Sequence, residues 1–201
     1  MERTISRGNL ELIVNDAKKA LIENSNDVAH GVEHHQNVAN NVDYILEKEG
    51  IKNRINYEAL KVAAWWHDYD RHSRNYSVMT ESLKEHGTTP EFIAEVVKII
   101  DGHSDLKKVK KLTDEQLILI LADKIEYVDL DRYKSSLKGM DGIELKVMQF
   151  YWKSRIKTVK KMMDGTKYKC ARDLFYEKLG NLHKYVKLEK PEDLHWFKGL
   201  V

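Results

Sequence analysis

A histidine and an aspartate stand side by side at the end of an apolar stretch in the first third of the sequence. In residues 60–68, seven mostly apolar residues lead directly into His67 and Asp68. At helical spacing, Leu60, Ala64 and His67 share one face, so His67 should point into the core. A carboxylate buried beside an imidazole is costly unless a positive charge neutralises it, and a divalent metal ion would do so. The pair therefore predicts part of a metal site.

Two further side chains are candidates for the same site. His34 lies four residues before Val38 and begins the apolar stripe of a helix expected over residues 34–48. Asp123 follows the strongly apolar run of residues 117–122, and its place one turn after two large apolar residues directs it inward. Each candidate thus comes from a different predicted helix.

Together these residues form a mixed set of nitrogen and oxygen donors. Two imidazoles and two carboxylates suit a first-row divalent ion such as Mn, Fe, Co, Ni or Zn, and they leave positions open for water and substrate. We therefore expect a catalytic rather than a sealed structural site. Its expected ligands are His34, His67, Asp68 and Asp123. The neighbouring His35 is an alternative to His34.

The elements that must position these ligands are all predicted to be helices. Only two prolines interrupt the chain, and no segment alternates in the manner of a strand. Helix boundaries are indicated by Gly50, by Thr89 before Pro90, by the capping box of residues 113–116 and by the glycines near 140. The expected helices cover residues 4–23, 34–48, 57–67, 76–85, 90–101, 114–130, 143–163 and 168–187, with a short one from Pro191.

The fold class is therefore predicted to be all-α. We expect a metal-binding helical core over residues 1–140 and C-terminal helices over 141–201 that pack on it, within one domain of 201 residues. The apolar positions of the helix over 143–163, including Phe150, Tyr151 and Trp152, are predicted as core and interface rather than as a platform for base stacking.

Composition narrows the functional classes. Apolar residues are 42% of the chain and charged residues 33%, which is typical of a soluble helical protein. The single cysteine, Cys170, cannot form an internal disulfide, and neither the start nor any later segment has the apolar length of a membrane span. These features predict a cytoplasmic protein without a membrane partner.

The charge is unevenly distributed along the chain. Residues 144–201 carry 14 Lys and Arg against 7 Asp and Glu, whereas residues 1–143 carry 20 against 25, within a net charge of +2. A basic C-terminal part favours an anionic ligand. Because its lysines alternate with acids and aromatics, we interpret most of them as a solvated helix face and do not expect a nucleic-acid partner.

The order of the candidate ligands resembles that of the HD-domain superfamily of metal-dependent phosphohydrolases. Residues 30–38 (HGVEHHQNV) and 65–68 (WWHD) look like its first two motifs, and residues 121–126 (LADKIE) fit its last one. Residues 99–104 (IIDGHS) are similar to a segment with a histidine in many small bacterial and archaeal members. Residues 150–179 resemble the helical C-terminal part of a small stand-alone subfamily.

This resemblance implies a helical fold around one divalent ion (Mn, Fe, Co, Ni, Zn or Mg). The implied activity is hydrolysis of a phosphoester or pyrophosphate bond in a small phosphorylated molecule, a nucleotide being favoured. The ion would lower the pKa of a bound water and polarise a phosphoryl oxygen, while the protein positions the reactants. The residues implied to act with the ion are Asp68, which orients the water, and Arg71, His72, His103 and Lys124, which grip phosphate oxygens.

The sequence departs from the superfamily pattern after the second motif. Where relatives often carry an acidic residue three or four positions after the aspartate, this chain has Arg71 and His72, and Asp70 comes one position early. The first motif also has Gly31 where an aspartate is common. The identity of the group that activates the water is thus left open.

Several alternatives therefore stand beside the hydrolase. A module that binds metal and nucleotide without catalysis would need no activating acid. A di-iron oxygenase of the same superfamily would need extra ligands, for which Asp70, His72, His86 and His103 are the nearby supply. His103 itself is either a phosphate or second-metal group or a helix-terminal histidine favoured by the helix dipole. A homodimer is compatible with the sequence.

Overall fold

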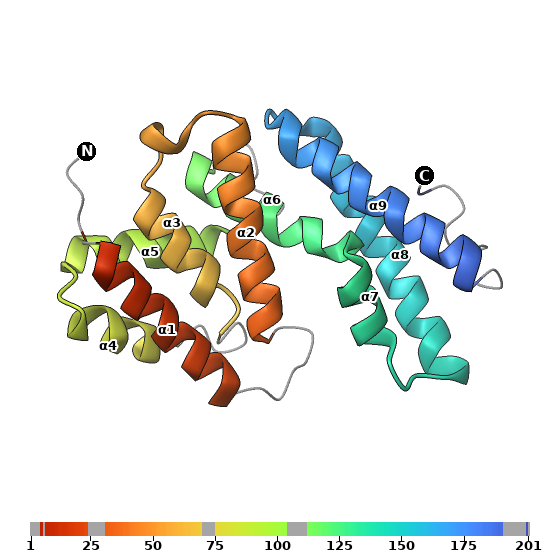
Figure 1. Cartoon of the computed structure of the whole chain (residues 1–201), viewed down its shortest axis with the longest axis horizontal. Coiled ribbons are helices and arrows are strands. Elements are labelled where there is room, and N and C mark those ends of the chain that lie inside the picture. Colours follow the sequence, from red (N-terminus) through yellow and green to blue (C-terminus); the bar gives the residue numbers. More distant parts are fainter. Residues whose placement is uncertain are drawn as a thin grey trace. The chain divides into compact units, whose positions relative to one another are not determined.

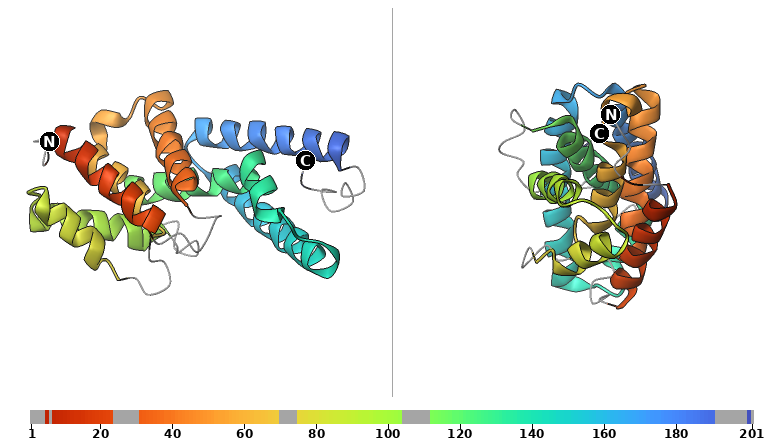
Figure 2. Two further views of the ribbon diagram at one scale, coloured as in Figure 1. Left: turned by 60° about the horizontal axis from the view of Figure 1, so that its bottom comes forward. Right: turned by 90° about the vertical axis from the view of Figure 1, so that its left-hand side faces the viewer.

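The structure is a computed structural model that describes residues 5, 7–23, 31–69, 75–103, 112–190 and 200. Figures 1 and 2 show helices and no strand in these residues, which confirms the all-α prediction. The α-helices are α1 (Arg7–Glu23), α2 (Val32–Lys48), α3 (Tyr57–Trp66), α4 (Ser77–Glu85), α5 (Pro90–His103), α6 (Asp114–Ile125), α7 (Leu130–Leu137), α8 (Gly142–Gly165) and α9 (Lys169–Glu189). The 3₁₀ turns are η2 (Lys52–Arg54) and η4 (Glu126–Val128). The helix expected from Pro191 lies outside the described residues.

The boundary signals in the sequence act as predicted at three helix ends. The Thr113 and Gln116 side chains cap α6 reciprocally: the Gln116 N–H donates to Thr113 Oγ1 over 3.3 Å, and the Thr113 N–H donates to Gln116 Oε1 over 3.0 Å. Thr89 Oγ1 accepts the Phe92 N–H at the start of α5. Gly50 ends α2 with a φ of 63°, a left-handed conformation that glycine adopts without strain.

The helix predicted over residues 114–130 is wrong at its C-terminal end. α6 stops at Ile125, the 3₁₀ turn η4 follows, and a separate helix, α7, begins at Leu130. The physical reason is the side chain of Asp129, whose Oδ1 accepts the N–H groups of Asp131 and Arg132 at 3.0 and 3.1 Å. This carboxylate therefore caps a new helix instead of continuing the old one.

The chain consists of two compact units, Met1–Ala122 and Asp123–Val201. The division falls inside α6 and thus earlier than the expected boundary at 140, so that η4 and α7 belong with the C-terminal helices. Whether the two units make one domain stays a prediction.

In the first unit, α3 is the central helix and packs against α1, α2 and α5 (Figure 1). Its small, apolar face is fully buried, with no exposed surface at Leu60, Ala63 or Ala64. Small side chains let neighbouring helices approach closely, which draws the C-terminal end of α3 into the middle of the unit. The end of α6 is fixed to α2 because Asn41 Nδ2 donates to the carbonyl of Ala122 over 3.0 Å.

Helices α1 and α4 of the same unit are joined by a polar contact. Asp16 Oδ2 lies 2.7 Å from Ser82 Oγ and 2.8 Å from His86 Nε2. Burial works to raise the pKa of Asp16, but the hydrogen bonds from Ser82 and His86 and the charges of His86 and Lys19 outweigh it and lower that pKa. His86, which the sequence offered as a possible extra ligand of a di-iron site, therefore joins α4 to α1.

In the second unit, α7, α8 and α9 pack around η4. The core of α8 and α9 is a stripe of large apolar side chains: Trp152, Ile156, Val159, Met163, Phe175, Leu179, Leu182 and Val186. The expectation that Val147, Phe150 and Tyr151 belong to this core is wrong, since they are 60%, 75% and 42% exposed. α8 carries apolar residues on more than one face, and the face that starts at Gln149 and Trp152 is the one that turns inward.

An ion network inside the second unit joins α9 to η4 and the start of α7. Lys178 Nζ lies 3.1 Å from Glu126 Oε1 and 2.9 Å from Asp129 Oδ2, and Glu126 is completely buried. Burial disfavours the Lys178 charge, but the two carboxylates outweigh it and raise the pKa of Lys178. Burial likewise opposes ionisation of Asp129, yet Lys178 and the capped N–H groups hold its pKa below the ordinary value.

Among the described residues, no helix is long and apolar enough to cross a lipid bilayer.

Removal of the Lys178 charge should destabilise the second unit. Lys178→Met leaves Glu126 buried without this cation, so we expect a loss of about 3–5 kcal/mol in the free energy of unfolding, measured by urea denaturation at pH 7. Lys184→Met, an exposed lysine on the same helix, is the control and should change stability by less than about 0.5 kcal/mol. Equal stability of the two variants would contradict a structural role for the network.

The pKa shifts of the same network define the pH range in which it stabilises the folded protein. The lowered pKa of Asp129 makes that carboxyl stabilising above its ordinary value of 3.8, and the effect is lost as pH falls through the lower folded value. The raised pKa of Lys178 makes the ammonium stabilising below 10.5, and the effect is lost as pH rises through the folded value. The stability difference between wild type and Lys178→Met should therefore be largest between these limits.

Candidate metal centre

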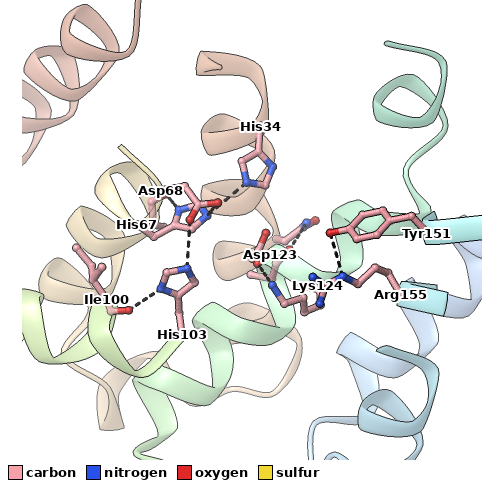
Figure 3. Close-up of polar contacts among 12 residues, drawn as sticks. His34, His67, Asp68, Ile100, His103, Asp123, Lys124, Tyr151 and Arg155 are labelled. Carbon is pink, nitrogen blue, oxygen red and sulfur yellow. Dashed lines mark hydrogen bonds and ion pairs between the residues drawn. The ribbon is translucent and has the colours of Figure 1, made fainter. Parts of the chain in front are cut away.

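Three of the four predicted ligands lie together in the first unit (Figure 3). His34 Nε2 is 3.3 Å from His67 Nε2, and His67 Nε2 is 3.7 Å from Asp68 Oδ2. One ligand atom from each of the three residues lies within 4.8 Å of the other two. The imidazoles of His34 and His67 are buried, at 5% and 2% exposure, as the inward orientation predicted for them requires.

The packing of α2 against α3 brings these side chains together. His34 stands in the first turn of α2, while α3 ends at Trp66 and places His67 at its C-cap. Asn56 fixes the start of α3 by accepting the Ala59 N–H, and the Tyr69 N–H bonds the carbonyl of Trp66 to close the turn that holds Asp68. The adjacent pair therefore presents both side chains at one helix end.

Backbone carbonyls select the ring tautomers. His67 Nδ1 lies 3.0 Å from the carbonyl oxygen of Ala64, and His103 Nδ1 lies 2.5 Å from that of Ile100. A carbonyl oxygen only accepts, so each Nδ1 is the protonated donor and each neutral ring has its lone pair at Nε2. An N–H held by a carbonyl on the far side of the ring is the usual support of a histidine that binds metal.

His103 is the residue that the structure adds to the predicted ligands around Asp68. It is the last residue of α5, is buried, and places Nε2 at 3.3 Å from Asp68 Oδ1. The Asp68 carboxylate thus has one oxygen near His67 and the other near His103. Its expected position at a helix C-terminus is confirmed, while its role as a phosphate or second-metal group stays a prediction.

His35 also borders the cluster. It is fully buried, and its ring centre lies 4.8 Å from that of His67 and 5.3 Å from that of His34. Its Nδ1 donates to the carbonyl of Gly31 over 3.0 Å. Among the described residues, however, the group of atoms close enough to share one ion includes His34 and not His35.

The cluster has the donor set and spacing that a divalent ion needs. Two ligand nitrogens of a tetrahedral ion at bond lengths near 2.05 Å are about 3.3 Å apart, which is the separation between the Nε2 atoms of His34 and His67. Without an ion, these two nitrogens could share only one proton, whereas an ion accepts a lone pair from each and is attracted by the Asp68 carboxylate. The residues present therefore fit a metal ion.

The remaining predicted site residues belong to other parts of the chain. Asp123 is the first residue of the second unit and is 3% exposed, so its predicted burial is confirmed, and it forms an ion pair with Lys124. Its role as the fourth ligand, and that of Lys124 as a phosphate-binding group, stay predictions. Arg71, His72 and Asp70 lie outside the described residues.

The sequence analysis did not single out Gly102, which precedes His103 on α5 and packs closely against α6. Gly102 faces Gln116 of α6, and a Cβ at Gly102 would come within 2.7 Å of Gln116 Cγ. Gln116 is held in place because its Nε2 donates to the carbonyl of Lys98 over 2.7 Å. A glycine inside an apolar helix, directly before a histidine, is the signal that could have pointed to this close approach.

No known protein family matches the sequence, and no curated protein matches it either. Among solved structures, the chain is similar to a crystal structure of a Lactobacillus plantarum protein that was determined as a structural-genomics target. The similarity has a TM-score of 0.66 at 20% identity and covers 94% of this chain and 98% of that one. At this level of identity it establishes the shared fold.

Substitution of Gly102 should disturb the His103 side of the cluster. Gly102→Ala forces Gln116 away from its two hydrogen bonds, so we expect a loss of about 1–3 kcal/mol in the free energy of unfolding. Gly180→Ala is the matched control, because a Cβ there meets nothing within 4 Å inside α9. It should stabilise by about 0.5–1 kcal/mol in the same urea titration, and a destabilisation no larger at 102 than at 180 would contradict the close packing.

Divalent metal should bind at the His34–His67–Asp68 cluster. We expect isothermal titration of EDTA-stripped protein with Mn²⁺, Ni²⁺ or Zn²⁺ to show saturable binding, with affinity reduced at least about tenfold in Asp68→Asn and in His67→Ala. His183→Ala removes a histidine of α9 and should leave the affinity unchanged. Equal affinities of wild type and both cluster variants would place the ion elsewhere.

Proposed function

We propose that this chain is a metal-dependent phosphohydrolase of the HD-domain type that cleaves a phosphoester or pyrophosphate bond in a small molecule, a nucleotide in particular. The observation that carries the proposal is the convergence of His34, His67 and Asp68, with the Nε2 atom of His67 fixed by its backbone contact. Residues that are 33 positions apart in the sequence meet at one point, in the order that the superfamily motifs require.

The donor set supports hydrolysis over a sealed structural site. Three protein ligands, or four with Asp123, leave room for water and a phosphate oxygen on most divalent ions. When bound, the ion would supply an acidic water and a Lewis acid for the phosphoryl group. His34 and His67 would bind it as neutral imidazoles, and Asp68 would add the negative charge.

Asp68 and His103 have a second task in this proposal. The two oxygens of Asp68 face different imidazoles, so one can bind the ion while the other orients a water molecule. Because its Nδ1–H is engaged with the Ile100 carbonyl, His103 Nε2 would accept a proton from a water molecule near Asp68 Oδ1 and would donate to that oxygen once the ring is protonated. Arg71, His72 and Lys124 are proposed to hold phosphate oxygens and to offset their charge in the transition state.

Phosphate release from a substrate panel tests the proposal. The stripped protein is loaded in turn with Mn²⁺, Co²⁺, Ni²⁺, Zn²⁺, Fe²⁺ or Mg²⁺ and offered nucleoside mono-, di- and triphosphates and p-nitrophenyl phosphate. We expect turnover that EDTA abolishes and that added metal restores. In His67→Ala and Asp68→Asn, kcat/KM should fall at least about hundredfold, since the ion supplies several kcal/mol of transition-state stabilisation, whereas His183→Ala should retain full activity.

Other results would favour the alternatives. Saturable nucleotide binding without turnover under any metal would support a non-catalytic module, as the absence of an acid at positions 71 and 72 suggests. Two irons per chain together with oxygen uptake would support an oxygenase. Full activity of His67→Ala would contradict a role for the cluster in either chemistry.

A further inference from the structure

A group of cations in the second unit is packed on phenol rings. Lys124 Nζ lies 5.3 Å and Arg132 Cζ 5.2 Å from the ring centre of Tyr127. On α8, Arg155 Cζ lies 5.0 Å from the ring centre of Tyr151, and Arg155 Nε donates to the Tyr151 hydroxyl over 3.0 Å (Figure 3). These five residues are called the cationic–aromatic cluster below.

Trp152, the residue after Tyr151 on α8, joins the two halves of the cluster: its Nε1 donates to the carbonyl of Tyr127 over 2.7 Å, and the two rings lie 6.1 Å apart. Burial raises the pKa of Tyr127; Lys124 and Arg132 act against this rise, while Asp123 and Tyr151 add to it. The hydrogen bond from Arg155 to Tyr151 and the proximity of Tyr127 raise the pKa of Arg155. Residues from α6, α7 and α8 and from the turn η4 thus meet in one place.

The cationic–aromatic cluster is itself positively charged. It contains three cations and no acid of its own, and the adjoining Asp123 pairs with Lys124. In the part of the chain that the structure describes, no carboxylate pairs with Arg155. The whole unit has the same sign, with 18 Lys and Arg against 12 Asp and Glu in residues 123–201. An anionic ligand would relieve the repulsion among these cations.

The cluster also offers an aromatic surface. Tyr151 is 42% exposed, and the preceding Phe150 is 75% exposed, so ring surface lies beside the guanidinium of Arg155. Arg155 uses Nε to bond Tyr151, which leaves its terminal nitrogens in the fork that suits two phosphate oxygens. Exposed rings next to such a fork are the pairing that binds a base and a phosphate of one nucleotide.

We propose that the cationic–aromatic cluster binds a nucleoside monophosphate unit, with Arg155 on the phosphate and the exposed ring of Tyr151 stacked on the base. The inference goes beyond the proposed function, because it assigns the second unit a nucleotide site of its own that needs no metal. Tyr127 is then a positioning residue, because its buried ring holds Lys124 and Arg132 at the cluster.

Binding to metal-free protein tests the cluster without any hydrolysis. The EDTA-treated full chain is titrated calorimetrically with AMP, GMP, CMP and UMP, and with ribose 5-phosphate, which lacks the base. We expect Arg155→Met to weaken the binding of the preferred monophosphate at least about tenfold, and Arg155→Lys to recover part of it. Lys157→Met, an exposed lysine on the same helix, is the control and should change binding less than about twofold.

The tyrosine variants separate stacking from charge. Tyr151→Leu should weaken the monophosphate about tenfold and leave ribose 5-phosphate unchanged, while Tyr151→Phe keeps the ring and should bind nearly as wild type. Both altered side chains are exposed, and thermal unfolding of the variants checks that the fold is intact. If Tyr151→Leu or Arg155→Met fails to fold, the Tyr151→Phe and Arg155→Lys variants still test the roles of the ring and the guanidinium. The comparison of monophosphates with ribose 5-phosphate on wild type still tests whether the base is bound.

The inference would be overturned if the wild-type protein bound none of the monophosphates, or if Arg155→Met bound them as tightly as wild type. It would also be overturned if a single-stranded oligonucleotide bound over a hundredfold more tightly than the monophosphates, since the surface would then be a nucleic-acid site. The outcome is separable from that of the hydrolase. Turnover that depends on His67, together with Arg155→Met that binds the monophosphates as tightly as wild type, sinks the cluster alone. Binding that depends on Arg155 without turnover sinks the hydrolase alone.

Discussion

The first unit depends on one electrostatic constraint, the placement of the Asp68 carboxylate, whose side chain is only 10% exposed, beside two imidazoles at the end of an apolar helix. A carboxylate in such a place needs positive charge or hydrogen-bond donors. Here the Nε2 atoms of His67 and His103 face its two oxygens, and a cation bound among them would attract the nitrogen lone pairs and the carboxylate together. The unit is built so that α3 and α5, which carry these histidines, pack directly on each other. The same requirement that makes the site costly to fold makes it able to hold a cation.

Rigid support follows from how each imidazole is held. The Nδ1 atoms of His67 and His103 bond carbonyls three residues earlier in their own chain segments. Because these contacts are local, each ring is oriented by its own helix end and not by contacts with another helix. Packing then has to bring only the Nε2 atoms to a common point. A site made this way loses little side-chain entropy when an ion binds, because its rings are already fixed.

The sequence predicted those features that local patterns determine. Helical spacing located the inward faces of α2 and α3, and capping signals at Thr89 and Thr113 set two helix starts. It did not predict that α6 ends at Ile125. An aspartate that caps a new helix, such as Asp129, cannot be told from one inside a helix until the path of the backbone is known. The exposed side of α8 was also missed, since apolar residues on several faces, such as Phe150 and Trp152, give no preference for one. The contact of Gly102 with Gln116 is a tertiary fact that no local pattern encodes.

The ion pair of Asp123 with Lys124 sets a condition on any ion that Asp123 would bind. Such an ion must compete with the Lys124 ammonium for the carboxylate. The ammonium stands over the ring of Tyr127, 5.3 Å from the ring centre, inside the cationic–aromatic cluster. By the reciprocity of linked equilibria, an anion that attracts the Lys124 ammonium away from Asp123 would in turn favour a cation at Asp123.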